Sequence, residues 1–113
     1  MPPPYELRAM AAGPHCSWTG VFGTVMDQNG LPLGGVQIQL VGDNGWQSPV
    51  ISTDSAGKYE IFIQASPVQG TWFAQILENG RPASDKIGFH TSSGGCDTDT
   101  GKQRFLIDWQ RVR

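Results

Sequence analysis

A chain of 113 residues has the length of one domain and can bury a single hydrophobic core. Its 15 glycines, 8 prolines and charged fraction of only 16% exclude a typical disordered chain and a helical bundle, and they favour short strands joined by many turns. A net charge of -2 offers no basic surface for nucleic acid, so we do not expect nucleic-acid binding. No apolar run approaches the roughly 20 residues that a membrane helix needs, so we do not expect membrane insertion.

The first residues, MPPPYELRAMAAGPH, carry four of the eight prolines of the chain. This composition is typical of an extended connection rather than of a core element. The stretch also lacks the charged start and apolar run of a signal peptide, so we expect either that the chain starts at Met1 without one or that a signal has been removed. We predict an extended arm or linker at residues 1–14 and a β-sandwich domain at residues 15–113.

Alternation of apolar and polar residues indicates the strands. In residues 36–40, VQIQL, three apolar side chains alternate with two glutamines, which is typical of a strand with one buried face. A proline at position 49 places its strand at a sheet edge or at a strand start. No stretch shows sustained helical periodicity. We predict an all-β fold, a single seven-stranded antiparallel Greek-key β-sandwich, with strands at residues 21–26, 36–40, 48–53, 59–63, 71–77, 86–91 and 104–109.

The stretch TDSAGKYEI, residues 53–61, joins two of these strands by a turn. The Asp54 side chain can hydrogen-bond to the turn backbone, and Gly57 can adopt the positive φ that such a turn requires. Tyr59 then starts the next strand as its first inward residue. The spacing predicts a hairpin, which is a folding signal and not a catalytic one.

Two stretches resemble the carboxypeptidase regulatory-like domains of the transthyretin-like sandwich type. They are GTVMDQNGLPLGGVQIQL, residues 23–40, and TDSAGKYEI, residues 53–61. The resemblance implies a β-sandwich, and it implies accessory, spacer or binding roles without catalytic residues. The turn residues that carry it are Asp27, Gly30, Pro32, Gly35, Asp54, Gly57 and Tyr59.

The C-terminal part, residues 84–109, also resembles modules of bacterial cell-surface proteins. In those modules a cysteine before the first strand pairs with a cysteine before the last, and Cys16 and Cys96 stand in these two places. The resemblance therefore implies a disulfide closing a loop of about 80 residues, which contributes about 4–5 kcal/mol in the chain-entropy model. Two unrelated thiols of an intracellular protein are the alternative. Related domains carry an isopeptide bond from a lysine in the first strand, but residues 21–26 contain no lysine, so we do not expect one here.

We do not expect a metal site, although two groups of residues have the side chains for one. His15, Cys16, His90 and Cys96 are zinc-ligand types, but neither the cysteines nor the histidines form a close pair. In the acidic loop DTDTG, Asp97 and Asp99 hold positions 1 and 3 of a calcium loop, and Asp108 falls at position 12. However, Lys102 replaces the glycine at position 6, and Asp108 lies in a predicted strand. We expect a solvated loop and no cofactor.

The four tryptophans divide into two groups. Trp18, Trp72 and Trp109 lie in or beside predicted strands, and we expect them in the core or at its edge. Trp46 follows GDNG in a loop, where a large aromatic is unexpected. It either stacks on a sugar ring or a partner protein, or folds back as a lid on the end of the sandwich.

Motifs for catalysis are missing from this sequence: G-x-S-x-G, a P-loop and H-E-x-x-H do not occur. We therefore expect a non-catalytic extracellular module with a structural, spacer or assembly role in a secreted or cell-surface protein. Its expected partners are neighbouring domains or copies of the same protein. The alternative is an accessory module that binds carbohydrate or protein through Trp46, with a polysaccharide as the first candidate ligand.

Overall fold

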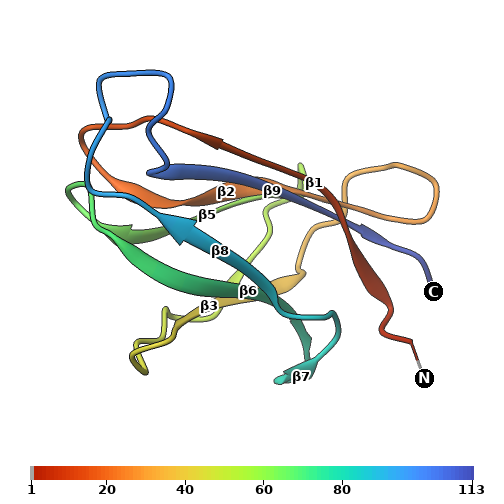
Figure 1. Ribbon diagram of the computed structural model, residues 1–113. Helices are drawn as coiled ribbons and strands as arrows, with labels where there is room; N and C mark the ends of the chain where they lie inside the picture. The colour runs from red at the N-terminus through yellow and green to blue at the C-terminus, as the bar shows by residue number, and fades with distance from the viewer. Residues whose placement is uncertain (1) are drawn as a thin grey trace.

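The computed structural model describes residues 2–113, which form two β-sheets packed face to face and contain no helix (Figure 1). The all-β class and the two-layer arrangement predicted from the sequence are confirmed. The predicted number of seven strands is wrong, because residues 2–113 form nine strands. They are β1 (Tyr5–Gly13), β2 (Thr19–Met26), β3 (Gln37–Gly42), β4 (Ile51–Ser52), β5 (Lys58–Gln64), β6 (Gly70–Glu78), β7 (Arg81–Pro82), β8 (Ile87–Thr91) and β9 (Arg104–Arg111).

The two sheets differ in the direction of their strands. Sheet A has the order β1-β9-β2-β5, and its central pair, β2 and β9, is parallel. Sheet B has the order β4-β3-β6, and both β7 and β8 pair with the other side of β6. All pairs except β2–β9 are antiparallel. The prediction of a wholly antiparallel sandwich is therefore wrong at one pair, and that pair places the starts of β2 and β9 at the same end of the molecule.

The N-terminal segment is part of sheet A. Residues 1–14 were predicted to lie outside the sandwich as an arm or linker, whereas residues 5–13 form the edge strand β1 along β9. Tyr5 is buried, and its backbone N–H donates to the Ala83 carbonyl at 3.0 Å. Because β1 and β9 are antiparallel, the Val112 N–H reaches the Pro4 carbonyl at 2.8 Å, and the two ends of the chain lie close together (Figure 1).

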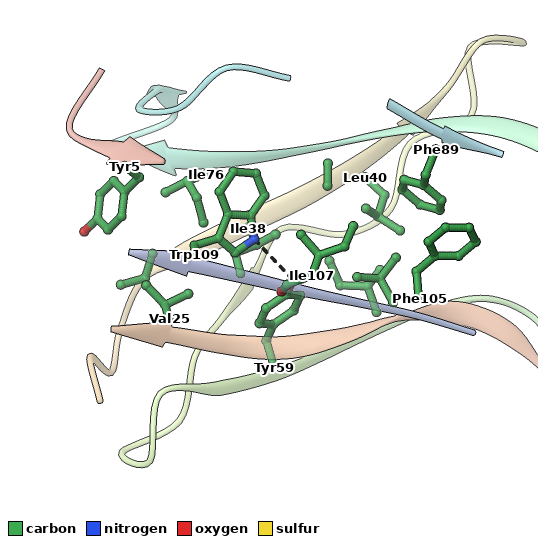
Figure 2. Close-up of a cluster of buried hydrophobic side chains, with 14 of the residues drawn as sticks. Tyr5, Val25, Ile38, Leu40, Tyr59, Ile76, Phe89, Phe105, Ile107 and Trp109 are labelled. Atoms are coloured by element: carbon green, nitrogen blue, oxygen red, sulfur yellow. Dashed lines mark hydrogen bonds between the residues drawn. The ribbon is translucent and has the colours of Figure 1, made fainter. Parts of the chain in front are cut away.

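The core lies between the sheets and is dominated by large apolar side chains (Figure 2). Trp109 is fully buried, and its Nε1–H donates to the hydroxyl of Tyr59 at 3.2 Å. The Tyr59 hydroxyl in turn donates to the Ile107 carbonyl on the neighbouring part of sheet A. Burial raises the pKa of Tyr59 well above its usual range, an effect that the hydrogen bond from Trp109 partly opposes. Tyr59 is thus a buried, neutral, hydrogen-bonded core residue.

The turn at residues 53–58 has the predicted chemistry. Asp54 Oδ1 accepts hydrogen bonds from the N–H groups of Ala56 and Lys58, both at 2.9 Å. Gly57 has a φ of 73°, in the left-handed region that glycine adopts most readily. The predicted hairpin is nevertheless wrong, because β4 belongs to sheet B and β5 to sheet A. The turn crosses from one sheet to the other, so Tyr59 points into the space between them.

The first turn signature packs against the second. Asp27 Oδ1 caps its own turn by accepting from the N–H groups of Asn29 and Leu31, and Pro32 forms an isolated bridge with Met26. The glycines at positions 30 and 35 both have positive φ. Thr53 joins the two turns: its hydroxyl donates to the Leu33 carbonyl at 2.7 Å and accepts from the Val36 N–H at 3.0 Å. The two signatures therefore form one interlocked end of the sandwich.

Candidate functional site

Cys16 and Cys96 form a disulfide, with their Cα atoms 4.9 Å apart. Cys16 precedes β2, and Cys96 lies in the loop from β8 to β9. Because β2 and β9 run in parallel as neighbours, these two connections meet at one end of sheet A. The pairing implied by the sequence resemblance is confirmed, and the alternative of two unrelated thiols is wrong.

Gln103 reinforces this end of the molecule, and the sequence analysis did not identify it. Its side chain is fully buried. Its Nε2 donates to the carbonyls of Ser92 and Gly94, each at 2.9 Å, and its Oε1 accepts from the His15 N–H at 3.1 Å. Gln103 therefore ties the loop that carries Cys96 to the segment that carries Cys16. A lone glutamine at the end of a polar loop gave no sequence signal for this role.

The residues weighed as zinc ligands have other partners. The two sulfur atoms are bonded to each other. His15 Nδ1 accepts from the Ser17 N–H at 3.1 Å, and His90 Nδ1 lies 2.9 Å from the Thr71 hydroxyl. Within residues 2–113, no group of three or more His, Cys, Asp or Glu side chains is arranged to hold a metal ion.

The residues weighed as calcium ligands are divided between a loop and a strand. Asp97 and Asp99 are exposed in the loop before β9. Asp108 lies in β9, and its Oδ1 accepts from the Thr24 N–H at 2.9 Å. This hydrogen bond connects β2 to β9 at the point where their parallel backbone pairing is interrupted.

Trp46 packs against the end of the core. It is half-buried, and its ring meets that of Trp72 edge-on, with the ring centroids 5.4 Å apart. Trp72 and Trp109 are buried, as expected for core residues. The arrangement of Trp46 is that of a lid over one end of the sandwich.

Trp18, which was expected in the core or at its edge, lies on the outer face of sheet A. Its ring covers Gly20, where any side chain would collide with it. Gly20 pairs with Phe62 of β5 on one side and with Arg104 of β9 on the other, so these side chains flank the indole ring. The rings of Trp18 and Phe62 are stacked with a centroid distance of 5.8 Å and an interplanar angle of 20°.

Arg104 is held between two aromatic rings. The central carbon of its guanidinium lies 4.0 Å from the ring centroid of Phe22 and 5.5 Å from that of Trp18. Such a cation–π arrangement fixes the plane of the guanidinium. Among residues 2–113, Arg104 has no carboxylate partner, and its Nε is buried without a hydrogen-bond acceptor. We call the four residues Trp18, Phe22, Phe62 and Arg104 the outer aromatic cluster.

Two hollows adjoin the outer aromatic cluster and share Phe22 and Leu106 in their walls. The smaller has a volume of about 300 Å³ and lies beside Arg104, where β1 offers only small residues, such as Ala11 and Gly13. The larger, of about 660 Å³, extends toward polar side chains, including Thr24, Lys58 and Glu60. The outer face of sheet A thus combines flat aromatic surface, an unpaired cation and hydrogen-bonding groups.

The sequence contains a signal for the outer aromatic cluster. Phe62 alternates with the inward residues of β5, so it occupies a position where a polar residue is expected. Phe22 breaks the alternation of β2 in the same way. Large aromatics at outward positions on neighbouring strands indicate an apolar patch on the outer face of the sheet.

Comparison with models of protein families gives no match to this chain. Comparison with curated proteins gives no match either. In the part of the chain that the structure describes, no helix is long and apolar enough to span a bilayer.

Proposed function

We propose that this chain is a non-catalytic module of a secreted or cell-surface protein, with a structural or assembly role. The observation that carries the proposal is the Cys16–Cys96 disulfide, which closes one end of the sandwich. Disulfides persist in oxidising compartments and are rare in the cytosol. The interlocked turns at residues 27–35 and 53–58 join further strands by hydrogen bonds of Thr53.

The resemblance to carboxypeptidase regulatory-like domains supports the same proposal. Its two signatures occupy the turns that lock together through Thr53, as a structural motif should. We also propose that the chain belongs to the carboxypeptidase regulatory-like family and that its strands are connected as a Greek key. No catalytic role follows from the resemblance, since its characteristic residues cap turns and fill the core.

The position of the chain ends favours one kind of structural role over another. Tyr5 pairs with Arg111 at the ends of β1 and β9. A continuing chain would therefore enter and leave the sandwich on the same side. This geometry favours a module that projects from its parent protein over a spacer joined end to end, and it leaves the outer faces free for contact with neighbours.

The alternative function is binding of carbohydrate or protein through Trp46. The edge-on packing of Trp46 on Trp72 weighs against it, because a half-buried lid offers less of its ring to a ligand. Stacking on a sugar requires an accessible aromatic face.

Sedimentation velocity and glycan arrays together test the proposal. We expect concentration-dependent self-association, or association with neighbouring domains of the parent protein, in sedimentation. Trp46→Ala should leave the array profile of the parent unchanged. If Trp46→Ala abolished binding to a defined polysaccharide without lowering stability, the alternative function would replace the structural one.

A further inference from the structure

We propose that the outer aromatic cluster is a binding site for an acidic polysaccharide. In this arrangement a pyranose ring lies on the exposed ring of Phe62, which Trp18 holds in place, and its anionic group pairs with Arg104. The inference goes beyond the structural role and does not rest on it, since it depends on the outer aromatic cluster and not on the disulfide.

Arg104 supplies the strongest part of the argument. Its guanidinium is fixed between Phe22 and Trp18, yet no carboxylate among the described residues neutralises it. A guanidinium is planar and presents paired donors that match a carboxylate or a sulfate. Because Nε is covered, the two Nη groups are the donors left for a ligand. Holding the cation in place beforehand reduces the entropy lost when an anion binds.

The aromatic rings supply a surface for the sugar itself. Phe62 has 52% of its surface exposed on the outward face of β5, whereas the preceding residue, Ile61, is buried in the core. The stacked arrangement with Trp18 holds both rings nearly parallel. Rigid aromatic side chains can cover the apolar face of a sugar at little entropic cost, because they have few rotatable bonds.

The shape of the face favours a chain of sugars over a globular partner. The two hollows meet at Phe22 and Leu106, so a path runs from Arg104 toward β5. The larger hollow is lined by polar side chains that can hydrogen-bond to sugar hydroxyl groups, namely Thr24, Asp54, Lys58 and Glu60. Its two carboxylates outnumber its one cation, so Arg104 is the group that would bind the anion. Volumes of about 300 and 660 Å³ suit single sugar units, and few polar groups beside apolar walls are typical of ligand sites.

Calorimetric titration with three matched oligosaccharides tests the proposal. The probes are a hexamer of galacturonate, a sulfated galactan hexamer and the neutral galactan hexamer. We expect at least one anionic probe to bind at least about tenfold more tightly than the neutral one, and added salt to weaken that binding. The better anionic probe identifies whether the natural group is a carboxylate or a sulfate.

Variants locate the site. Arg104→Gln and Phe62→Ser should each weaken the anionic probe by about tenfold or more. Arg104→Lys keeps the charge but loses the planar fork, so it should fall between the parent and Arg104→Gln. The matched controls are Arg81→Gln, an exposed cation on sheet B, and Leu31→Ser, an apolar residue 60% exposed in a turn; both should bind like the parent.

Three results would overturn the proposal. The first is no binding of either anionic probe up to about 5 mM, and the second is equal binding of the neutral probe. The third is loss of self-association, rather than of sugar binding, in Phe62→Ser, which would assign the face to a second copy of the chain. Since Phe62 is exposed, Phe62→Ser tests the site even if the Arg104 variants fold poorly.

Discussion

Replacing Gly57 by alanine tests the interlocked turns. Gly57 has a φ of 73°, and a Cβ there would lie 2.6 Å from the Val25 carbonyl oxygen and 2.9 Å from the Leu33 nitrogen. The left-handed conformation costs a non-glycine residue about 1–2 kcal/mol. Collision with two backbone atoms that are themselves hydrogen-bonded adds about 1–3 kcal/mol, as in an overpacked core. We expect Gly57→Ala to lower the free energy of unfolding by about 2–5 kcal/mol.

Gly30→Ala is the matched control for this prediction. Gly30 has a φ of 80°, but a Cβ there would meet no atom within 4 Å. Its substitution should cost only the conformational part, about 1–2 kcal/mol. Urea denaturation of both variants, with the disulfide intact, measures the difference. Equal losses in the two variants would refute the conclusion that Gly57 is required for close packing between the turns.

Four other predictions follow from the core and the disulfide. The intact protein should be two hydrogens lighter than its sequence mass, and reduction should lower its stability by about 4–5 kcal/mol; an unchanged mass would contradict the crosslink. Tyr59→Phe should cost about 2–4 kcal/mol in urea denaturation, because the Trp109 N–H and the Ile107 carbonyl lose a buried partner. Burial raises the pKa of Tyr59, so the folded state holds the phenol proton more tightly than the unfolded state does. The free energy of unfolding should therefore fall as the pH rises above about 10. Tyr59→Phe should reduce this dependence on pH, and an identical dependence in the variant would argue against burial of the phenol. Trp46→Ala should cost about 1–3 kcal/mol, whereas a neutral result would show that Trp46 does not act as a lid on Trp72.

Alternation and turn chemistry predicted much of the sandwich. Residues 36–40 and 59–63 alternate because each strand has one face in the core, and this local property can be seen in the sequence. The caps formed by Asp27 and Asp54 are equally local. The partner of each strand is not a local property, which is why the turn at residues 53–58 predicted a hairpin and proved to cross between sheets.

The N-terminal strand and the outer aromatic cluster depend on contacts between distant segments. The sequence of β1 shows little alternation of apolar and polar residues and contains several small residues. The strand is stabilised by its backbone pairing with β9 and by the burial of Tyr5. The outer aromatic cluster brings Trp18, Phe62 and Arg104 together from three separate segments. Only the pairing of Gly20 with both neighbouring strands places them side by side. Outward aromatics were visible in the sequence, but their proximity was not.

The most direct test of the account is surface labelling of intact cells that produce the protein, followed by peptide mapping without reduction. An impermeant amine reagent should label the protein before lysis, and the map should contain one crosslinked peptide pair joining Cys16 to Cys96. Labelling only after lysis, together with two free thiols that alkylate readily, would contradict the proposal of a disulfide-stabilised module outside the cell.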